Sequence, residues 1–274
     1  MTKLKIYRKK TLGIEVPYYH TGENESTAII FLHGNRGSGL MFRSVLTSGL
    51  SRKYTLIAPD LPGFGDCVVE DQLLENISWD FLKEVVVEFS NSFSFESIVL
   101  CGHSMGGHLA IESINHIKAS RGIVIFGTPP VKGMQDLPNA FLPNPNMELL
   151  LKAEISDSDI DQLIAGSTEK QTTKEFLKAI VRKAEPNVLK NIYESITYQI
   201  EDEVNILSSL RSFPICCIHV KNDPLINYQY LVDLKLPNLF TGKVMVIDGD
   251  GHVPQIDYLD EFLDLLKTYM EEVL

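Results

Sequence analysis

The chain has 274 residues, 44% of them hydrophobic, and carries 36 acidic against 25 basic residues, for a formal net charge of -11. A chain of this length and apolar content can bury a sizeable core, so we expect a globular protein. The sequence is acidic overall and has no block of basic residues that could bind phosphates. It also has no run of about 18 apolar residues, the length needed to span a bilayer. We therefore expect no nucleic-acid partner, no membrane span and, without a secretory signal pattern, a cytoplasmic location.

The chain begins with two predicted strands and continues as an alternation of short strands and helices. The first twenty residues alternate loosely around Gly13, which is typical of two strands joined by a turn. Helical periodicity then appears around Leu82 and again around Leu263. Six apolar runs, each typical of a strand buried on both faces, lie at residues 28–33, 54–59, 97–102, 122–127, 214–220 and 243–248. This order predicts an α/β fold, a mostly parallel sheet with helices on both faces.

The region from 128 to 212 breaks this alternation. It contains no convincing strand, and proline-rich sequence marks its start. Ser156 with Asp159 and Thr172 with Glu175 have the three-residue spacing of helix capping boxes. We therefore predict that residues 128–212 form a helical cap inserted in a core domain made of residues 1–127 and 213–274.

Metal and cofactor signals are absent from the sequence. The four cysteines contain no C-x-x-C pair, and three of them lie in or beside apolar runs, which favours buried free thiols. The histidines show no metal-ligand spacing, and the glycine-rich loop at 34–39 lacks the G-K-[ST] ending of a phosphate-binding loop. We predict neither a metal nor a cofactor.

The segment "GHSMG" places Ser104 between an apolar strand and a helix. A G-x-S-x-G sequence in this context forms a sharp turn that exposes the serine hydroxyl at the end of the strand. Gly102 and Gly106 permit the close approach of strand and helix. The alternative interpretation of Ser104 is a simple helix N-cap.

A serine nucleophile needs a base and an acid that orients the base. Asp223 follows a predicted strand in "NDP", and His252 lies in "GDGHVP" after the last strand, so the chain order serine, aspartate, histidine fits this fold. An Asx-turn before a proline is the structural alternative for Asp223. Three other acidic residues could orient the imidazole instead: Asp248, Asp250 and Asp257.

The oxyanion of such a reaction needs two N–H donors. The backbone N–H of Met105, at the start of the helix after the serine, can supply one. The backbone N–H of Asn35, in the loop "HGNRGSG", can supply the other.

These motifs together resemble the α/β-hydrolase superfamily. "HGNRGSG", "DLPGFGD", "GHSMGGH", "NDP" and "GDGHVP" occur in the expected order over nearly the whole chain. The resemblance implies an eight-stranded sheet with a helical cap, Ser104 as nucleophile, His252 as base, Asp223 as acid, and Asn35 and Met105 as oxyanion donors. Dehalogenases and epoxide hydrolases of this fold use aspartate in place of the serine, so acyl transfer without a cofactor is the expected chemistry.

Within the superfamily the chain is similar to N-acyl-homoserine lactonases, through "HGN", "GTPPV" and "NLFTGKVMVIDGDGH". Those lactonases carry glutamate where Asp223 stands and a cap tyrosine where Leu163 falls. The resemblance implies a small ester or lactone as substrate, and we predict substrate contacts from Leu163, Ile164 and Pro129.

Three other functions remain open at this point. They are a general carboxylesterase, a carbon-carbon bond hydrolase, and a small-molecule receptor built on a hydrolase scaffold. The carbon-carbon hydrolase would need a basic residue in the pocket, and Arg182 or Lys183 could supply it. The oligomeric state is unknown from the sequence.

Overall fold

A computed structural model describes residues 4–23, 26–145 and 147–274 of the chain. Their central element is an eight-stranded sheet with the order β1-β2-β4-β3-β5-β6-β7-β8. Strands β3 to β8 run parallel to one another, whereas β2 pairs antiparallel with both β1 and β4. The strands are β1 (Ile6–Thr11), β2 (Ile14–Thr21), β3 (Thr27–Leu32), β4 (Thr55–Pro59), β5 (Ser97–His103), β6 (Ser120–Phe126), β7 (Ile215–Asn222) and β8 (Met245–Asp250). All six apolar runs and the initial hairpin are confirmed as strands.

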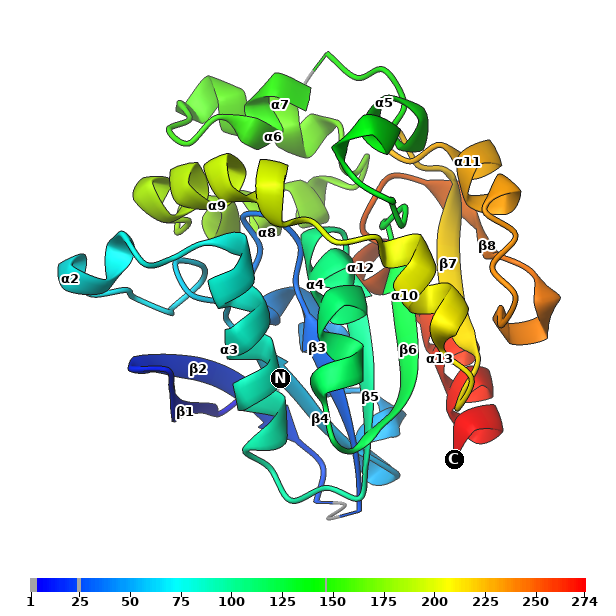
Figure 1. The fold of residues 1–274 in the computed structure, drawn as a ribbon. Coiled ribbons are helices and arrows are strands. Elements are labelled where there is room, and N and C mark those ends of the chain that lie inside the picture. Colours follow the sequence, from blue (N-terminus) through cyan, green and yellow to red (C-terminus); the bar gives the residue numbers. More distant parts are fainter. Residues whose placement is uncertain (1–3, 24–25, 146) are drawn as a thin grey trace.

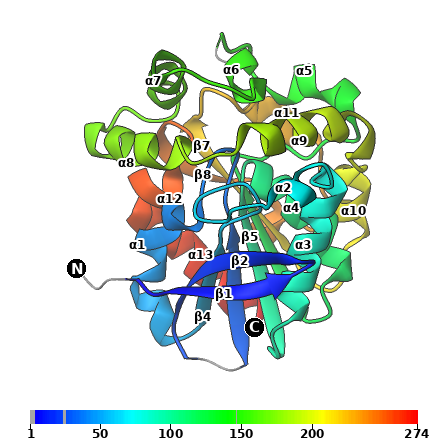
Figure 2. The ribbon, with the colours of Figure 1, turned by 90° about the vertical axis from the view of Figure 1, so that its left-hand side faces the viewer.

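Helices cover both faces of this sheet (Figures 1 and 2). On one face lie α3 (Trp79–Asn91), α4 (Met105–Ser113) and α10 (Glu203–Ser209), with α4 in contact with the other two. On the other lie α1 (Arg43–Leu46), α12 (Pro254–Asp257) and α13 (Leu259–Val273). Short helices α2 (Asp71–Leu74) and α11 (Tyr228–Asp233) flank the sheet. The α/β fold predicted from the sequence is confirmed.

The central strands are apolar throughout because each face of the sheet is buried by a helix layer. Side chains alternate between the faces: Ile30 and Leu32 of β3 join the cluster under α3 and α4, whereas Ile29 and Phe31 join the cluster under α1 and α13. The four cysteines are free and buried, and burial raises the pKa of their thiols.

Residues 128–212, which we call the inserted segment, contribute no strand to the sheet among the described residues. Their helices from α5 to α9 lie above the carboxyl ends of the parallel strands (Figure 1). α10, in contrast, packs against α4 beside the sheet. The segment predicted as the cap, which ends at residue 212, therefore includes one helix that belongs to the layer covering the sheet. The helices above the sheet are α5 (Leu137–Ala140), α6 (Met147–Leu151), α7 (Asp157–Ala165), α8 (Gln171–Val181) and α9 (Pro186–Gln199).

One of the two predicted capping boxes is present. The Ser156 side chain accepts from the Asp159 N–H, and the Asp159 carboxylate accepts from the Ser156 N–H at the start of α7. The prediction for Thr172 was wrong, because α8 already begins at Gln171 with Lys170 as its N-cap. Thr172 and Glu175 therefore both lie inside α8, and Thr172 is not its N-cap.

Candidate active site

Ser104 lies at the junction of β5 and α4, at the carboxyl edge of the sheet. Its backbone has φ 51° and ψ -122°, a left-handed conformation that is strained for a residue with a side chain. The Ser104 N–H donates to the Phe126 carbonyl at 2.9 Å, and the Ser104 carbonyl accepts from the Gly107 N–H at 2.8 Å. These bonds at both ends of the residue hold the turn in its strained form.

The glycines on either side of Ser104 are required by contact with backbone. A Cβ on Gly102 would lie 2.4 Å from the Gly106 carbonyl oxygen, and a Cβ on Gly106 would lie 2.3 Å from the Leu32 carbonyl oxygen. Backbone atoms cannot move aside for such a contact. The Ser104 side chain makes no capping bond to α4, which argues against the simple N-cap interpretation.

His252 follows β8 and is paired with Asp223, which follows β7. His252 Nδ1 and Asp223 Oδ2 are 2.7 Å apart, and both side chains are buried. Asp223 Oδ1 meanwhile accepts from the Leu225 N–H at 2.9 Å and the Ile226 N–H at 3.3 Å. Asp223 therefore forms the turn and binds the imidazole at the same time, with one carboxylate oxygen for each.

The three rival aspartates are occupied elsewhere. Asp248 forms an exposed ion pair with Lys221 at 3.0 Å, and Asp250 accepts from the Asn222 side chain at 2.9 Å. Asp257 accepts from two threonine hydroxyls of the inserted segment, Thr168 and Thr173. The orienting partner of His252 is thus Asp223.

His103 links the serine turn to the histidine loop. It directly precedes Ser104, and its Nε2–H donates to the His252 carbonyl at 2.8 Å. Burial, together with the neighbouring His252, holds the pKa of His103 well below its ordinary value, so this imidazole is neutral. The Ser104 turn and the loop that carries His252 are therefore joined by a hydrogen bond between uncharged groups. Two ring nitrogens of these histidines, His103 Nδ1 and His252 Nε2, have no hydrogen-bond partner among the described residues.

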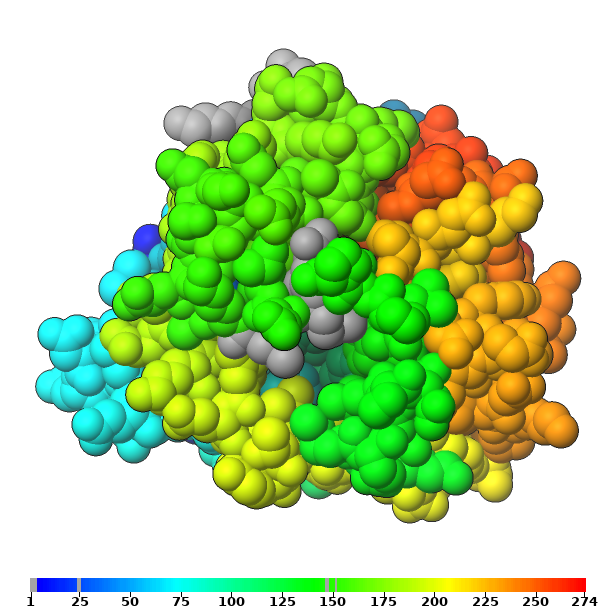
Figure 3. All heavy atoms as spheres, turned by 90° about the horizontal axis from the view of Figure 1, so that it is seen from above, coloured from blue at the N-terminus to red at the C-terminus, as the bar shows by residue number. Residues whose placement is uncertain are grey.

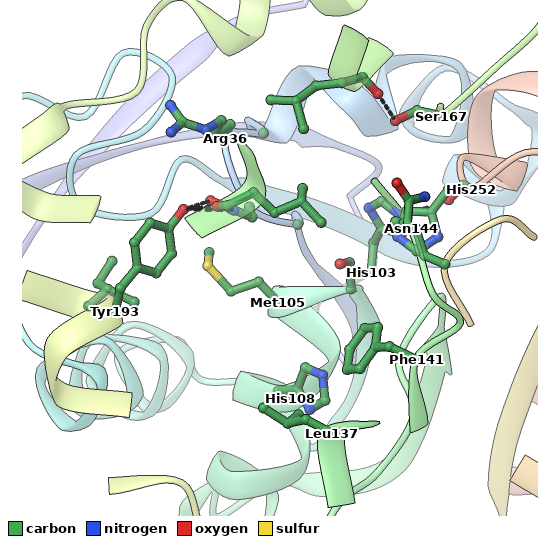
Figure 4. A pocket seen from close by; sticks show the side chains of 18 of the residues that line it. Arg36, His103, Met105, His108, Leu137, Phe141, Asn144, Ser167, Tyr193 and His252 are labelled. Atoms are coloured by element: carbon green, nitrogen blue, oxygen red, sulfur yellow. Dashed lines mark hydrogen bonds between the residues drawn. The ribbon is translucent and has the colours of Figure 1, made fainter. Parts of the chain in front are cut away.

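Asn35 lies beside the serine turn in the loop after β3. Its side-chain Nδ2 donates to the Leu150 carbonyl and to the Tyr193 hydroxyl, each at 2.9 Å. The Tyr193 hydroxyl also donates to the Leu150 carbonyl (Figure 4). These bonds connect the loop to α6 and α9 of the inserted segment and occupy the Asn35 side chain. Gly34 permits the close approach, because a Cβ there would lie 3.1 Å from Ser104 Cβ.

His33, at the base of the same loop, is buried and neutral. Its Nδ1–H donates to the Gly34 carbonyl at 2.8 Å, and its Nε2 accepts from the Leu61 N–H at 3.0 Å. Burial lowers the pKa of His33 to about 4. Both ring nitrogens of His33 are therefore used in hydrogen bonds that hold the loop.

A cavity of about 950 Å³ lies between the serine turn and the inserted segment. Figure 3 shows, from above, a hollow between α5 and α9 over this region. Ser104, Met105, Asn35 and His252 all line the cavity, and so do the predicted substrate contacts Leu163 and Ile164. Further apolar side chains complete the wall, among them Met41, Met134, Leu137, Phe141, Leu142, Leu177, Ile180, Val181, Ile192, Ile196 and Leu225.

One predicted substrate contact and both basic residues considered for the carbon-carbon hydrolase lie outside the cavity wall. The predicted contact Pro129 is buried and is not among the residues that line the cavity. Arg182 and Lys183 lie outside the cavity in exposed ion pairs, Arg182 with Asp157 at 2.8 Å and Lys183 with Asp66 at 2.6 Å.

Several polar wall residues were not singled out as functional by the sequence. Three of them are Tyr193 on α9, Arg36 after Asn35, and His108 on α4. Spacing could have found His108, which lies four residues after Ser104 and therefore on the same side of α4. No local pattern points to Tyr193, whose partner Asn35 is 158 residues away.

Within the described ranges, no group of three or more His, Cys, Asp or Glu residues is arranged to hold a metal ion. The same part of the chain contains no helix long and apolar enough to cross a bilayer.

The chain belongs to the alpha/beta hydrolase family, whose model matches residues 29–265. It is 23% identical over 266 residues to "Putative esterase/lipase 1" of Mycoplasma pneumoniae, covering 91% of this chain and 93% of that protein. The fold is similar to that of a mutant of the N-acyl homoserine lactonase AidH complexed with N-hexanoyl homoserine lactone. That similarity has a TM-score of 0.90 and 24% identity, and covers 98% of each chain. An esterase from Thermogutta terrifontis matches with a TM-score of 0.77 and 17% identity, over 98% of this chain and 99% of that one.

Proposed function

We propose that this protein is a serine hydrolase that cleaves a small carboxylic ester or lactone through an acyl-enzyme. The observation that carries the proposal is the strained Ser104 at the floor of a cavity that it shares with the Asp223-paired His252. Strain at a residue of this kind is maintained only where the surrounding structure imposes it, and it accumulates at reactive positions. In this proposal residues 128–212 act as the cap of the cavity.

In the first half of the reaction, His252 Nε2 removes the proton of Ser104 as Oγ attacks the substrate carbonyl. Asp223 holds the proton of His252 on Nδ1, which leaves the lone pair on Nε2. The backbone N–H groups of Asn35 and Met105 receive the negative oxygen; that of Met105 is one of the first N–H groups of α4, which have no acceptor within the helix. Protonated His252 then gives its proton to the leaving alkoxide.

In the second half, His252 activates a water molecule that attacks the acyl-enzyme and regenerates Ser104. When the substrate is a lactone, the alcohol stays attached to the acyl group, and water releases a hydroxy acid. No cofactor takes part in this scheme.

The substrate class that we propose first is an N-acyl-homoserine lactone. The cavity wall is mainly apolar, which suits an acyl chain, and a few polar groups lie near Ser104, which suits a lactone headgroup. The fold similarity to AidH agrees with this proposal. Esters of short acids are the second substrate class, in line with the names of the Mycoplasma pneumoniae and Thermogutta terrifontis relatives.

The carbon-carbon hydrolase receives less support. Arg182 and Lys183, which could have held its carboxylated substrate, are bound to surface carboxylates instead. Arg36 does line the cavity, but its guanidinium donates to the backbone carbonyls of Lys152 and Ala153. A receptor without turnover would retain the same residues, so only an activity measurement separates it from an enzyme.

The test is to follow ring opening of N-acyl-homoserine lactones of short to long acyl chain by mass spectrometry, with p-nitrophenyl butyrate as an ester. Each substrate is given to the wild-type protein and to Ser104→Ala. Ring opening that disappears in Ser104→Ala supports a lactonase. Ester cleavage without ring opening supports the esterase, and full turnover by Ser104→Ala contradicts the mechanism.

A further inference from the structure

His108 is a polar residue in an otherwise apolar part of the cavity wall. It lies on α4 four residues after Ser104, and its backbone N–H donates to the Ser104 carbonyl at 3.3 Å, so the two residues are about one helical turn apart along the chain. Figure 4 shows its ring beside Leu137 and Phe141 at the lower wall of the cavity. The side chain is 11% exposed, and no described residue forms a hydrogen bond with its Nε2.

The other ring nitrogen of His108 is bound to a buried carboxylate. Nδ1 lies 2.8 Å from Oε1 and 3.0 Å from Oε2 of Glu203, whose side chain is fully buried at the start of α10. Oε2 also accepts from the Val131 N–H at 2.8 Å. The Glu203 carboxylate accepts a hydrogen bond from Nδ1–H and so fixes the imidazole plane, which leaves the Nε2 edge for the cavity.

A purely structural ion pair between α4 and α10 would not need a place on the cavity wall. We propose that His108, held by Glu203, is a substrate anchor that donates a hydrogen bond from Nε2 to a carbonyl oxygen in the acyl part of the substrate. This inference rests on the proposed function, because it takes Ser104 as the residue that attacks the scissile carbonyl.

The separation of the two residues selects the substrate group. In an N-acylamino ester or lactone the amide carbonyl carbon is three bonds from the scissile carbonyl carbon, a reach that fits a side chain about one helical turn from Ser104. An anchor there distinguishes N-acylamino substrates from simple alkyl esters of the same length, because the latter leave the Nε2–H without an acceptor.

The surroundings of His108 favour the protonated imidazole that can donate from Nε2. Burial lowers its pKa, but the carboxylates of Glu203 and Glu112 outweigh burial, and the pKa is raised. Glu112 lies on α4 as well, where its carboxylate accepts from the Trp79 indole N–H and pairs with Lys83 at 3.2 Å. Lys83 also pairs with Asp80 at 2.6 Å and with Glu201 at 2.7 Å. No described lysine or arginine pairs with Glu203, so a protonated His108 supplies the positive charge beside that carboxylate.

The test compares p-nitrophenyl N-acetylglycinate with p-nitrophenyl pentanoate, two esters of equal chain length of which only the first carries an amide. The main variant is the double change His108→Leu with Glu203→Gln, which avoids an unpaired buried carboxylate. His108→Gln, combined with the same Glu203→Gln change, places a side-chain N–H near the position of Nε2 and serves as the rescue variant. His116→Leu, at an exposed histidine outside the cavity, is the matched control.

We expect His108→Leu with Glu203→Gln to lose about tenfold in kcat/KM for the N-acetylglycinate relative to the pentanoate, mainly through KM, and His108→Gln with Glu203→Gln to recover most of it. Equal losses for both esters, or no loss for either, overturn the anchor while leaving the hydrolase intact. If the wild-type protein cleaves neither these esters nor the lactones, the proposed function fails and this inference fails with it.

Discussion

Replacing Asp223 with asparagine tests the assignment of the acid, because the structure determines how the new amide must lie. The position of Oδ1 accepts from the N–H groups of Leu225 and Ile226, so the asparagine oxygen must stay there. The amide NH2 then occupies the position of Oδ2, 2.7 Å from His252 Nδ1. A donor at that point requires a lone pair on Nδ1, so the proton of His252 moves to Nε2.

An imidazole with its proton on Nε2 cannot take the proton of Ser104. Loss of the correct tautomer in this type of site lowers kcat by about 10⁴-fold, or about 5.4 kcal/mol of activation free energy. The reverse orientation of the amide would place its NH2 against two backbone N–H donors, leaving both without an acceptor, so this orientation is disfavoured. We therefore expect Asp223→Asn to reach the activity of Ser104→Ala within about tenfold.

The assay is initial-rate hydrolysis of p-nitrophenyl butyrate, with thermal unfolding to show that the variant is folded. Asp248→Asn is the control, because Asp248 is a rival aspartate that makes only an exposed ion pair. It should retain nearly full activity. If Asp223→Asn keeps more than about a tenth of the wild-type kcat, Asp223 does not set the tautomer of His252 and the reasoning is refuted.

Two further predictions concern the loop beside Ser104 and the buried cluster behind the cavity. Tyr193→Phe removes the hydroxyl that binds Asn35 and the Leu150 carbonyl, and should lower kcat for p-nitrophenyl butyrate about tenfold; unchanged kcat would show that Asn35 is held without it. Burial, with Glu203 nearby, raises the pKa of Glu112 to about 7 from 4.5, so the folded state binds this proton more tightly than the unfolded chain. The contribution of the protonated Glu112 carboxyl to the free energy of unfolding is therefore fully present below about pH 4.5 and is lost as the pH rises to about 7. Urea unfolding at pH 5 and pH 8 should show a smaller decline in Glu112→Gln than in wild type, and an equal decline would contradict the shift.

The sequence predicted the strands well because burial on both faces leaves a local signature. Every residue of β4 must be apolar or hydrogen-bonded, and its neighbours in the chain show this without reference to the rest of the molecule. The start of α8 was predicted less well. Thr172 has the spacing of a capping box, but the helix begins at Gln171, since contacts of this region with Asp257 decide where its first turn lies.

The candidate site divides in the same way. Ser104 could be found because a sharp turn needs small residues next to it in the chain, and His252 because it follows the last strand. Asp223 could only be proposed among several aspartates, since the choice depends on which carboxylate lies 2.7 Å from the imidazole. Tyr193 and Glu203 were missed, because each acts on a residue about 100 or more positions away.

The sequence by itself therefore determined the α/β fold, the strained serine turn and the chain order of the candidate catalytic residues. Each of these depends on residue types that are adjacent or close in the chain, where steric limits and hydrophobic periodicity act directly. Only the tertiary structure decided which aspartate orients His252, that Pro129 lies away from the cavity, and that His108 stands with Glu203 on its wall. These three features depend on which side chains from distant segments of the chain lie in the same buried volume. A pattern of neighbouring residues cannot predict such long-range contacts.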